Sequence, residues 1–259
     1  IIFGRKRRRP DERDYLRELF IRMLLHSEER GPHASGLAWL KTDGSHRIFK
    51  RPMRAHELVY EKQFQEMLGQ VDNETTILMG HTRWRTRGNE FNNRNNHPIR
   101  AGIVIGPHNG TIYHADYLFR RLGLPRYAEV DSELIFRLAD RFAPEGPIDQ
   151  DGLKKALALC RGQMSAVLAS RLDPGTITVL KGNKPLCLRI HRQHRVVLYA
   201  SDDTFIDFAV DNEKGWRELE VPPMTMLTIR HEDVRAIENS EFRFIPQERK
   251  GTLPEGVNA

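Results

Sequence analysis

Cysteine is scarce in this sequence. Cys160 and Cys187 are the only two among 259 residues, which excludes a disulfide framework and a cysteine-based metal cluster. Each lies in an apolar segment, where a thiol usually serves as inert packing, so neither is a good candidate for a nucleophile. So low a cysteine content is typical of a protein in a reducing cytoplasm.

Long apolar runs are absent as well. No stretch approaches the roughly 20 apolar residues that a membrane helix needs. The basic residues near the N-terminus have no apolar stretch beside them, so they do not form a secretory signal. We therefore expect a cytoplasmic protein with no membrane segment.

The signatures of common cofactors are also missing. The chain has neither a glycine-rich dinucleotide fingerprint nor a phosphate-loop lysine motif, so no cofactor is expected. Four histidines are candidate metal ligands, but none belongs to a His-x-x-x-His or His-x-x-Glu-His pairing, so no metal site is expected. These histidines are His81, His97, His108 and His114.

The charge balance is basic. Lysine and arginine number 41 against 35 acidic residues, a formal net charge of +6. Part of the excess lies in the run Arg5, Lys6, Arg7, Arg8 and Arg9. A solvated loop is the favoured interpretation, because the run is short and no aromatic residue is interleaved with it. The alternative is a phosphate-binding patch for nucleic acid or an acidic partner.

Helices are grouped and do not strictly alternate with strands, and strands dominate the second half of the chain. Spacing of apolar residues and turn residues predicts a helix from Pro10 to before Gly31, and helices over 56–68, 132–142, 150–160 and 204–210. Strands are expected over 35–40, 75–79, 103–105, 111–113, 164–170, 176–180, 186–190, 196–200, 224–229 and 242–245. The pattern indicates an α+β fold with antiparallel sheets.

Loops and boundaries complete the expected organisation. Residues 85–96 are rich in arginine and asparagine and form a long polar loop, which is usually functional or mobile. Residues 106–110 carry a strong turn signal. We expect one domain over residues 1–245, followed by a loose C-terminal tail over 246–259.

Eight short motifs follow one another along the chain: Ile1–Gly4, Glu29–Ala38, Gly80–Gly88, Asn96–Pro98, His108–Ile112, Asp131–Glu133, Arg161–Gly162 and Ala200–Asp202. In this order they resemble the motifs of class II (N-terminal-nucleophile) glutamine amidotransferases, above all the branch that makes glucosamine 6-phosphate. The strongest is Gly80–Gly88, which is similar to that branch's His-Thr-Arg-Trp-Ala-Thr-His-Gly.

This resemblance implies a fold and a reaction. The fold is the four-layer αββα sandwich of N-terminal-nucleophile hydrolases, with two stacked, mainly antiparallel sheets. The reaction is hydrolysis of L-glutamine to glutamate and ammonia by the thiol of an N-terminal cysteine, with its own α-amine as the base. That cysteine is absent here and is expected as a Cys-Gly just before Ile1.

The resemblance also assigns roles to polar residues. Asn109 and Gly110 would form the oxyanion hole, although Asn-Gly is also a strong hairpin turn. Arg83 would bind the α-carboxylate of glutamine, with a surface ion pair as the alternative. Asp131 would bind the α-ammonium, with a helix N-cap as the alternative.

Further residues are placed near the substrate by family position. Trp84 and Thr86 would lie on the loop that closes over glutamine, although Trp84 could equally belong to the core. His97 would line the pocket, and Arg30 would lie near the nucleophile. Arg85 and Arg87 depart from the family, which has alanine and histidine at these positions.

Three functions remain open at this level. The first is a glutaminase domain that supplies ammonia to a synthase subunit or to a further domain. The second is a catalytically inactive module that docks an acidic partner or nucleic acid. The third is a hydrolase of another γ-glutamyl compound. The residue before Ile1 distinguishes the first two.

Overall fold

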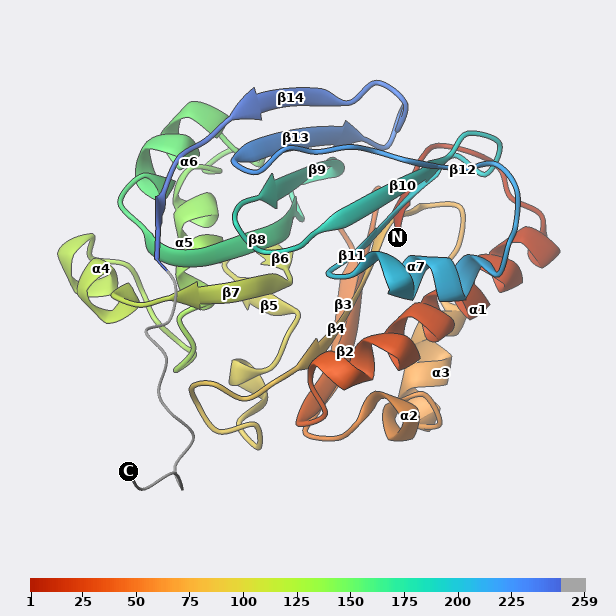
Figure 1. The fold of residues 1–259 in the computed structure, drawn as a ribbon, viewed down its shortest axis with the longest axis horizontal. Helices are drawn as coiled ribbons and strands as arrows, with labels where there is room; N and C mark the ends of the chain where they lie inside the picture. The colour runs from red at the N-terminus through yellow and green to blue at the C-terminus, as the bar shows by residue number, and fades with distance from the viewer. Residues whose placement is uncertain (248–259) are drawn as a thin grey trace, which may run out of the picture.

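Two stacked β-sheets form the centre of the protein in the computed structural model, which describes residues 1–247 (Figure 1). The first sheet contains, in spatial order, β12 (Trp216–Glu218), β10 (Cys187–His191), β11 (Val196–Ala200), β1 (Ile2–Phe3), β4 (Thr75–Arg83), β2 (Ala34–Lys41) and β3 (His46–Arg51). Its strand pairs are all antiparallel.

The second sheet is organised around one long strand. Its order is β14 (Glu238–Glu241), β13 (Thr225–Arg230), β9 (Asp173–Lys181), β8 (Arg161–Ser170), β6 (Val104–Gly106) and β5 (Ile99–Ala101). Two further strands, β7 (His108–Ile112) and β15 (Ile245–Pro246), also pair with β8. Only the β15–β8 pair is parallel.

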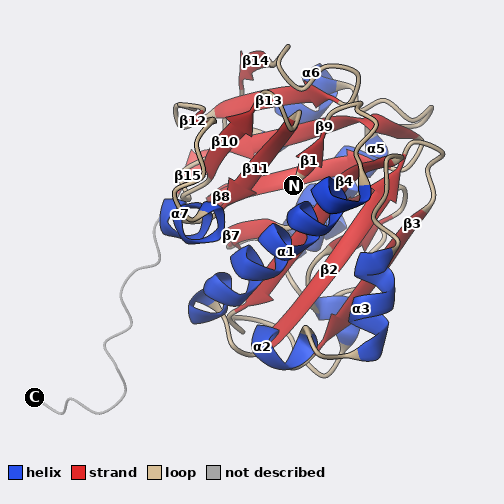
Figure 2. Cartoon of the chain, turned by 90° about the vertical axis from the view of Figure 1, so that its right-hand side faces the viewer, coloured by secondary structure: helices blue, strands red, loops and turns tan. Residues whose placement is uncertain are grey.

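Helices cover both outer faces of the sheet pair. The first sheet carries α1 (Pro10–His26), α2 (Ala55–Leu58), α3 (Lys62–Gly69) and α7 (Asp203–Val210), and the second carries α4 (Ala115–Arg121), α5 (Glu133–Arg141) and α6 (Gln150–Leu157). Figure 2 shows α1 lying across the strands of the first sheet. Two 3₁₀ turns, η1 (Ser27–Arg30) and η2 (Asn93–Asn95), complete the elements. The predicted four-layer αββα architecture is therefore confirmed.

The period-two alternation of strand side chains separates the layers. On β2, Leu37 and Trp39 pack toward the helices, whereas Ala38 and Leu40 pack between the sheets. Both faces of β2 are therefore buried, which explains its nearly unbroken run of buried residues.

One helix that the sequence predicts as continuous is two separate helices in the structure. Residues 56–68 were expected to form a single helix, but the structure has α2 and α3 with a break between them. Leu58 and Met67 are nine residues apart and would point to opposite faces of one straight helix. Because of the break, both are buried, at 0% and 4% exposure.

The second half also differs from expectation in detail. The strand expected over 242–245 is replaced by β14 and β15, and between them Phe242 and Phe244 pack into the core under α4–α6. Of the expected tail, Pro246 and Gln247 continue beside β8, and 248–259 lie outside the described residues. The sequence did not predict β3, β5, β12, β14 or α4.

No helix within residues 1–247 is long and apolar enough to cross a membrane.

Candidate active site

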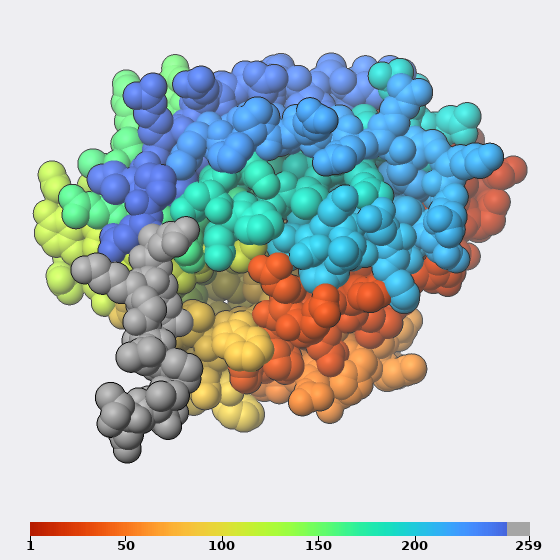
Figure 3. Space-filling model, viewed as in Figure 1, coloured from red at the N-terminus to blue at the C-terminus, as the bar shows by residue number. Residues whose placement is uncertain are grey.

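A cavity of about 340 Å³ lies where the two sheets meet the loop after β4. In Figure 3 the surface is hollowed where the red N-terminal, yellow and blue-green segments meet. The cavity wall includes Ile1 and all eight predicted site residues, namely Arg30, Arg83, Trp84, Thr86, His97, Asn109, Gly110 and Asp131. Segments from the first residue to Phe205 are therefore brought to one hollow.

Asn109 and Gly110 lie in strand β7, not in a turn. Asn109 is opposite Ser165 and Gly110 opposite Met164 on β8. The preceding strand β6 pairs with the same β8, so only Pro107 interrupts one extended segment. The turn expected over 106–110 is therefore wrong, because pairing with β8 overrides the local turn preference of Asn-Gly.

The backbone at Gly110 is one that only glycine adopts easily. Its φ is +144°, and a Cβ at this position would lie 2.0 Å from the Gln163 carbonyl oxygen. The side chain of Asn109 makes only a long contact, from Nδ2 to the Pro185 carbonyl at 3.5 Å. Its amide therefore stays available to a ligand in the cavity.

Arg83 is almost completely buried, with 4% of its surface exposed, so the surface ion pair considered for it does not form. Its Nη1 donates to Asn96 Oδ1 at 2.8 Å, and its Nη2 donates to the Gly88 carbonyl at 3.0 Å and to the Arg87 carbonyl. Burial lowers the pKa of Arg83, and the negative charges of Glu90 and Asp131 oppose that shift. Arg83 thus ties the end of β4 to the loop that follows it.

Asp131 is buried in the wall of the same cavity. Its Oδ2 accepts a hydrogen bond of 2.6 Å from the Ile112 backbone N–H, at the end of β7. Helix α5 has Ser132 as its N-cap residue, and no side chain caps it. The N-cap alternative for Asp131 is therefore wrong, and the carboxylate instead fixes the end of the strand that carries Asn109 and Gly110.

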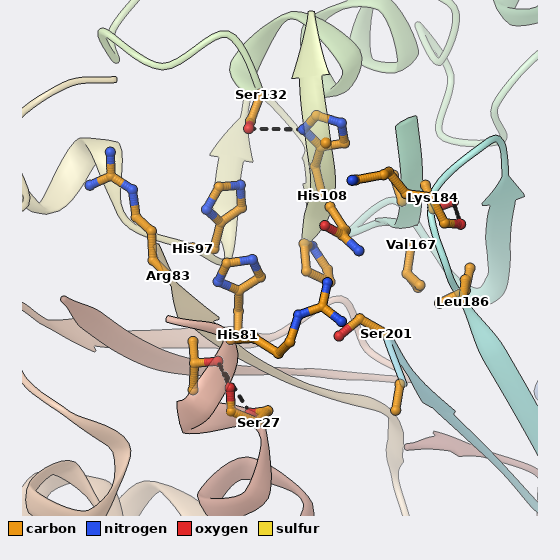
Figure 4. A pocket seen from close by; sticks show the side chains of 18 of the residues that line it. Ser27, His81, Arg83, His97, His108, Ser132, Val167, Lys184, Leu186 and Ser201 are labelled. Carbon is orange, nitrogen blue, oxygen red and sulfur yellow. Dashed lines mark hydrogen bonds between the residues drawn. The ribbon is translucent and has the colours of Figure 1, made fainter. Parts of the chain in front are cut away.

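Three histidines form one wall of the cavity (Figure 4). The rings of His81 and His97 stack with centroids 4.2 Å apart, and His108 Nδ1 lies 2.9 Å from Ser132 Oγ. Burial lowers the pKa of His81 to about 3 and that of His97 well below its usual value. Within residues 1–247, neither ring nitrogen of His97 has a hydrogen-bond partner. Burial therefore favours the neutral forms of His81 and His97.

The loop after β4 carries Trp84 and Thr86 to the mouth of the cavity. Trp84 is 59% exposed and meets the His33 ring edge-on at 5.3 Å, so its placement in the core is wrong. The two arginines that depart from the family pattern make ion pairs, from Arg85 to Glu90 at 3.0 Å and from Arg87 to Asp116 at 2.6 Å. These pairs fasten the loop to itself and to α4.

The start of the described chain also reaches the cavity. Ile1 is buried, and its backbone nitrogen donates to the Leu78 carbonyl at 2.6 Å. Arg30, at the end of η1, lines the same cavity and lies 3.7 Å from Asp202. The chain thus enters β1 from the cavity wall.

The basic run does not form a single patch. Arg8 is 3% exposed, and its Nη2 donates to the Gly4, His194 and Arg195 carbonyls at 3.0, 2.9 and 3.1 Å. Lys6 pairs with Glu12. Only Arg5, Arg7 and Arg9 are exposed, so the run contributes less positive surface than its sequence suggests.

Other reactive groups lie away from this chemistry. Burial raises the pKa of the Cys160 thiol to about 12, and that of Cys187 is also raised. One His/Glu group within residues 1–247 is compact enough to hold a metal ion: His191, His194 and Glu213. Its members already bond to one another and to the backbone, as in His194 Nε2–Glu213 Oε1 at 3.1 Å. None of the three lines the cavity.

The structure adds cavity residues that the sequence did not single out. Figure 4 shows Lys184 and Leu186 facing Arg83 and His97 across the hollow. Lys184 comes from the turn between β9 and β10, and Ser201 lies after β11. Ser201 belongs to the Ala200–Asp202 stretch of the family resemblance, which assigned it no role. Lys184 belongs to no motif, so no local signal in the sequence could have identified it.

Known proteins resemble this chain in sequence and in fold. No protein-family model matches the chain. The chain is 30% identical over 195 residues to the glutamine–fructose-6-phosphate aminotransferase (isomerizing) of Staphylococcus epidermidis, which is 73% of this chain and 30% of that protein. The Staphylococcus aureus counterpart is also 30% identical, over 193 residues. The chain thus spans about 30% of the length of these curated relatives.

Solved structures share the fold. The glutamine phosphoribosylpyrophosphate amidotransferase of B. subtilis superposes with a TM-score of 0.66 at 22% identity, covering 93% of this chain and 48% of that one. A glutamine aminotransferase class-II domain protein from Silicibacter pomeroyi has a TM-score of 0.54 at 18% identity, covering 81% and 91%. At these identities the likeness concerns the fold alone.

Proposed function

Because this chain belongs to the class II glutamine amidotransferase domain family, we propose that it hydrolyses the side-chain amide of L-glutamine to glutamate and ammonia. The observation that carries the proposal is the convergence on one cavity of Arg83, Asp131 and the Asn109–Gly110 pair beside the start of β1. Each group matches one requirement of acyl transfer from a free amino acid.

The proposed nucleophile is the thiol of a cysteine that precedes Ile1. Ile1 lines the cavity, so residues immediately before it would enter the hollow near Asn109 and Gly110. The thiolate attacks the amide carbon, and the carbonyl oxygen becomes an oxyanion. The Asn109 amide and the Gly110 backbone N–H would donate to that oxygen. Ammonia leaves on taking up a proton, and water then hydrolyses the thioester to release glutamate.

Arg83 and Asp131 would select the amino-acid head group. A guanidinium has five N–H donors. Arg83 donates three of them to acceptors in the loop, which leaves two for a carboxylate. Asp131 Oδ2 is occupied by Ile112, so Oδ1 would accept from the α-ammonium. Recognition of both charges would favour free glutamine over a glutamine within a peptide.

The use of the ammonia is a further part of the proposal. The curated relatives are named as aminotransferases that act on fructose 6-phosphate, and this chain spans about 30% of their length. We therefore propose that the ammonia passes to a synthase domain or subunit. The acceptor would be set by that partner and not by the cavity described above.

The test uses the natural protein. Its intact mass and N-terminal sequence are determined, and glutamate release from L-glutamine is then assayed beside a variant in which the proposed cysteine is replaced by alanine. We expect a mature Cys-Gly-Ile-Ile-Phe start, turnover of glutamine, and no turnover by the variant. Absence of that cysteine, or a natural protein that releases no glutamate, would overturn the proposal and leave a binding module with an enzyme's fold.

A further inference from the structure

A second hollow of about 660 Å³ lies between the outer edges of the two sheets. Its walls come from the edge strands β3 and β5, the turn η2 and the first turns of α5. The volume falls within the range of sites that take small organic ligands. None of its lining residues lines the candidate active site.

Positive charge gathers in this hollow. Five cationic residues line it against one acidic residue. That carboxylate, Glu133, is already engaged by Arg137 at 2.9 Å and by the backbone N–H groups of Tyr127 and Ala128. Within residues 1–247, the other four cations have no carboxylate in salt-bridge contact: Lys50, Arg51, Arg94 and Arg100.

These four side chains keep donors available. Arg100 makes one bond, from Nε to the Gly102 carbonyl at 3.2 Å, and Arg94 makes none within residues 1–247. Lys50 donates to the Asn96 and Pro98 carbonyls at 2.5 and 3.0 Å. A concave surface concentrates the field of such charges, and arginine forks match the oxygens of a phosphate group.

We propose that this hollow binds a small phosphorylated ligand, with Arg94 and Arg100 as forks on the phosphate and Lys50 as the charge beneath it. An alternative explanation for the cations on β3 and β5 is that charged side chains on edge strands hinder pairing with another chain. That role needs only scattered charges, whereas here four cationic residues without a carboxylate partner in the described part of the chain line one recess, although the Arg51 guanidinium itself turns to Gln63 and the Phe49 ring. A polynucleotide would instead need an extended basic track, and the recess is bounded by α5 and η2.

The position of the hollow connects it with the active-site loop. Lys50 bonds to the carbonyls on either side of His97, and His97 lines the first cavity. Arg94 lies in η2, within the loop that starts at Trp84. A phosphate in the second hollow would therefore contact the segment that also shapes the first one.

The test is calorimetric titration of the full chain with pyrophosphate, AMP and a hexose 6-phosphate at constant ionic strength set with sodium chloride. The readout is binding, so it does not depend on glutamine turnover. We expect saturable binding of at least one of these compounds, weakened about tenfold or more in the variant R94Q/R100Q. The matched control is R47Q, which removes one exposed charge from β3 outside the hollow.

Each outcome decides the proposal. Preference for AMP or for the sugar phosphate would support it and identify the organic part of the ligand. No saturable binding, or equal weakening by R47Q and by R94Q/R100Q, would overturn it. Binding of a polynucleotide in a parallel titration with none of the three small compounds bound would also overturn it.

Discussion

Gly110 and Gln163 approach each other so closely that no side chain fits between them. A Cβ on Gly110 would lie 2.0 Å from the Gln163 carbonyl oxygen and 2.9 Å from His108 Nε2. The contact joins β7, which carries the proposed oxyanion donors, to β8, the longest strand of the second sheet. The absence of a side chain at Gly110 is therefore a condition for the geometry of the site.

Replacing Gly110 with alanine is expected to destabilise the protein by roughly 3 kcal/mol or more, because the change adds a backbone clash to an unfavourable φ. The matched control is Gly69→Ala at the end of α3, where a Cβ meets nothing within 4 Å. That change should be neutral or stabilise by up to about 1 kcal/mol. Urea unfolding of both variants checks this, and equal stabilities would contradict it.

Asn109→Ala is expected to lower kcat for glutamine hydrolysis by about 10²–10³, since it removes one proposed donor to the oxyanion. KM should change little, because the ground-state carbonyl gains less from this donor than the transition state does. Steady-state kinetics measure both values. Asn239→Ala, at an exposed position on β14, serves as the control. A rise in KM at unchanged kcat would assign Asn109 to substrate binding instead.

Arg8→Ala is expected to cost about 2–4 kcal/mol of folding stability, because three backbone carbonyls lose a buried charged donor. Arg7→Ala, on the exposed neighbour, should change stability by less than about 0.5 kcal/mol. Midpoints of urea unfolding compare the two. A loss in Arg7→Ala as large as that in Arg8→Ala would show that net charge of the run, and not the buried position, controls stability.

Acid should destabilise the protein through its buried histidines. In the folded state the pKa of His81 lies near 3 and that of His97 well below its usual value, whereas unfolded histidine titrates near 6.5. Because the folded pKa is depressed, the unfolded chain binds more protons as pH falls below about 6.5. Stability is therefore full above that pH and is lost toward lower pH.

The magnitude can be measured on His97. Each such histidine should lower the free energy of unfolding by about 1.4 kcal/mol between about pH 7.5 and about pH 5.5. In His97→Asn, the loss over this range should be smaller than in the parent protein by about that amount. Urea unfolding at the two pH values gives the comparison. The same loss in both proteins would show that His97 takes up its proton without cost in the folded state.

Much of the fold was accessible from the sequence because it follows from local patterns. The helix beginning at Pro10 and the strands near residues 35–40 and 196–200 have clear periodicity and lie where the structure has them. Short elements with few apolar residues were missed. For β3, the pairing with β2 compensates for the unfavourable composition of His46–Arg51, and pairing is not visible in a local window.

For the candidate site, the sequence likewise indicated some features and not others. The order of motifs selected eight residues, and all eight line one cavity. The local surroundings of those residues were not accessible. The dipeptide Asn109–Gly110 favours a turn but lies in strand β7. Trp84 is a large apolar residue of the kind usually found in a core, but it lies in an exposed loop. In both cases contacts with distant segments decide the conformation.

By itself, the sequence determined the α+β class of the fold, because that depends on periodicity. The resemblance of its ordered motifs to a known family indicated the four layers and the polar groups around the cavity. Only the tertiary structure decided that Arg8 is a buried donor, that Arg83 holds the active-site loop, and that Lys50, Arg94 and Arg100 share a recess. The bonded residues are 13 positions apart for Arg83 and Asn96 and 187 positions apart for Arg8 and Arg195. Strand pairing and packing, which a local window of sequence does not show, bring these groups together.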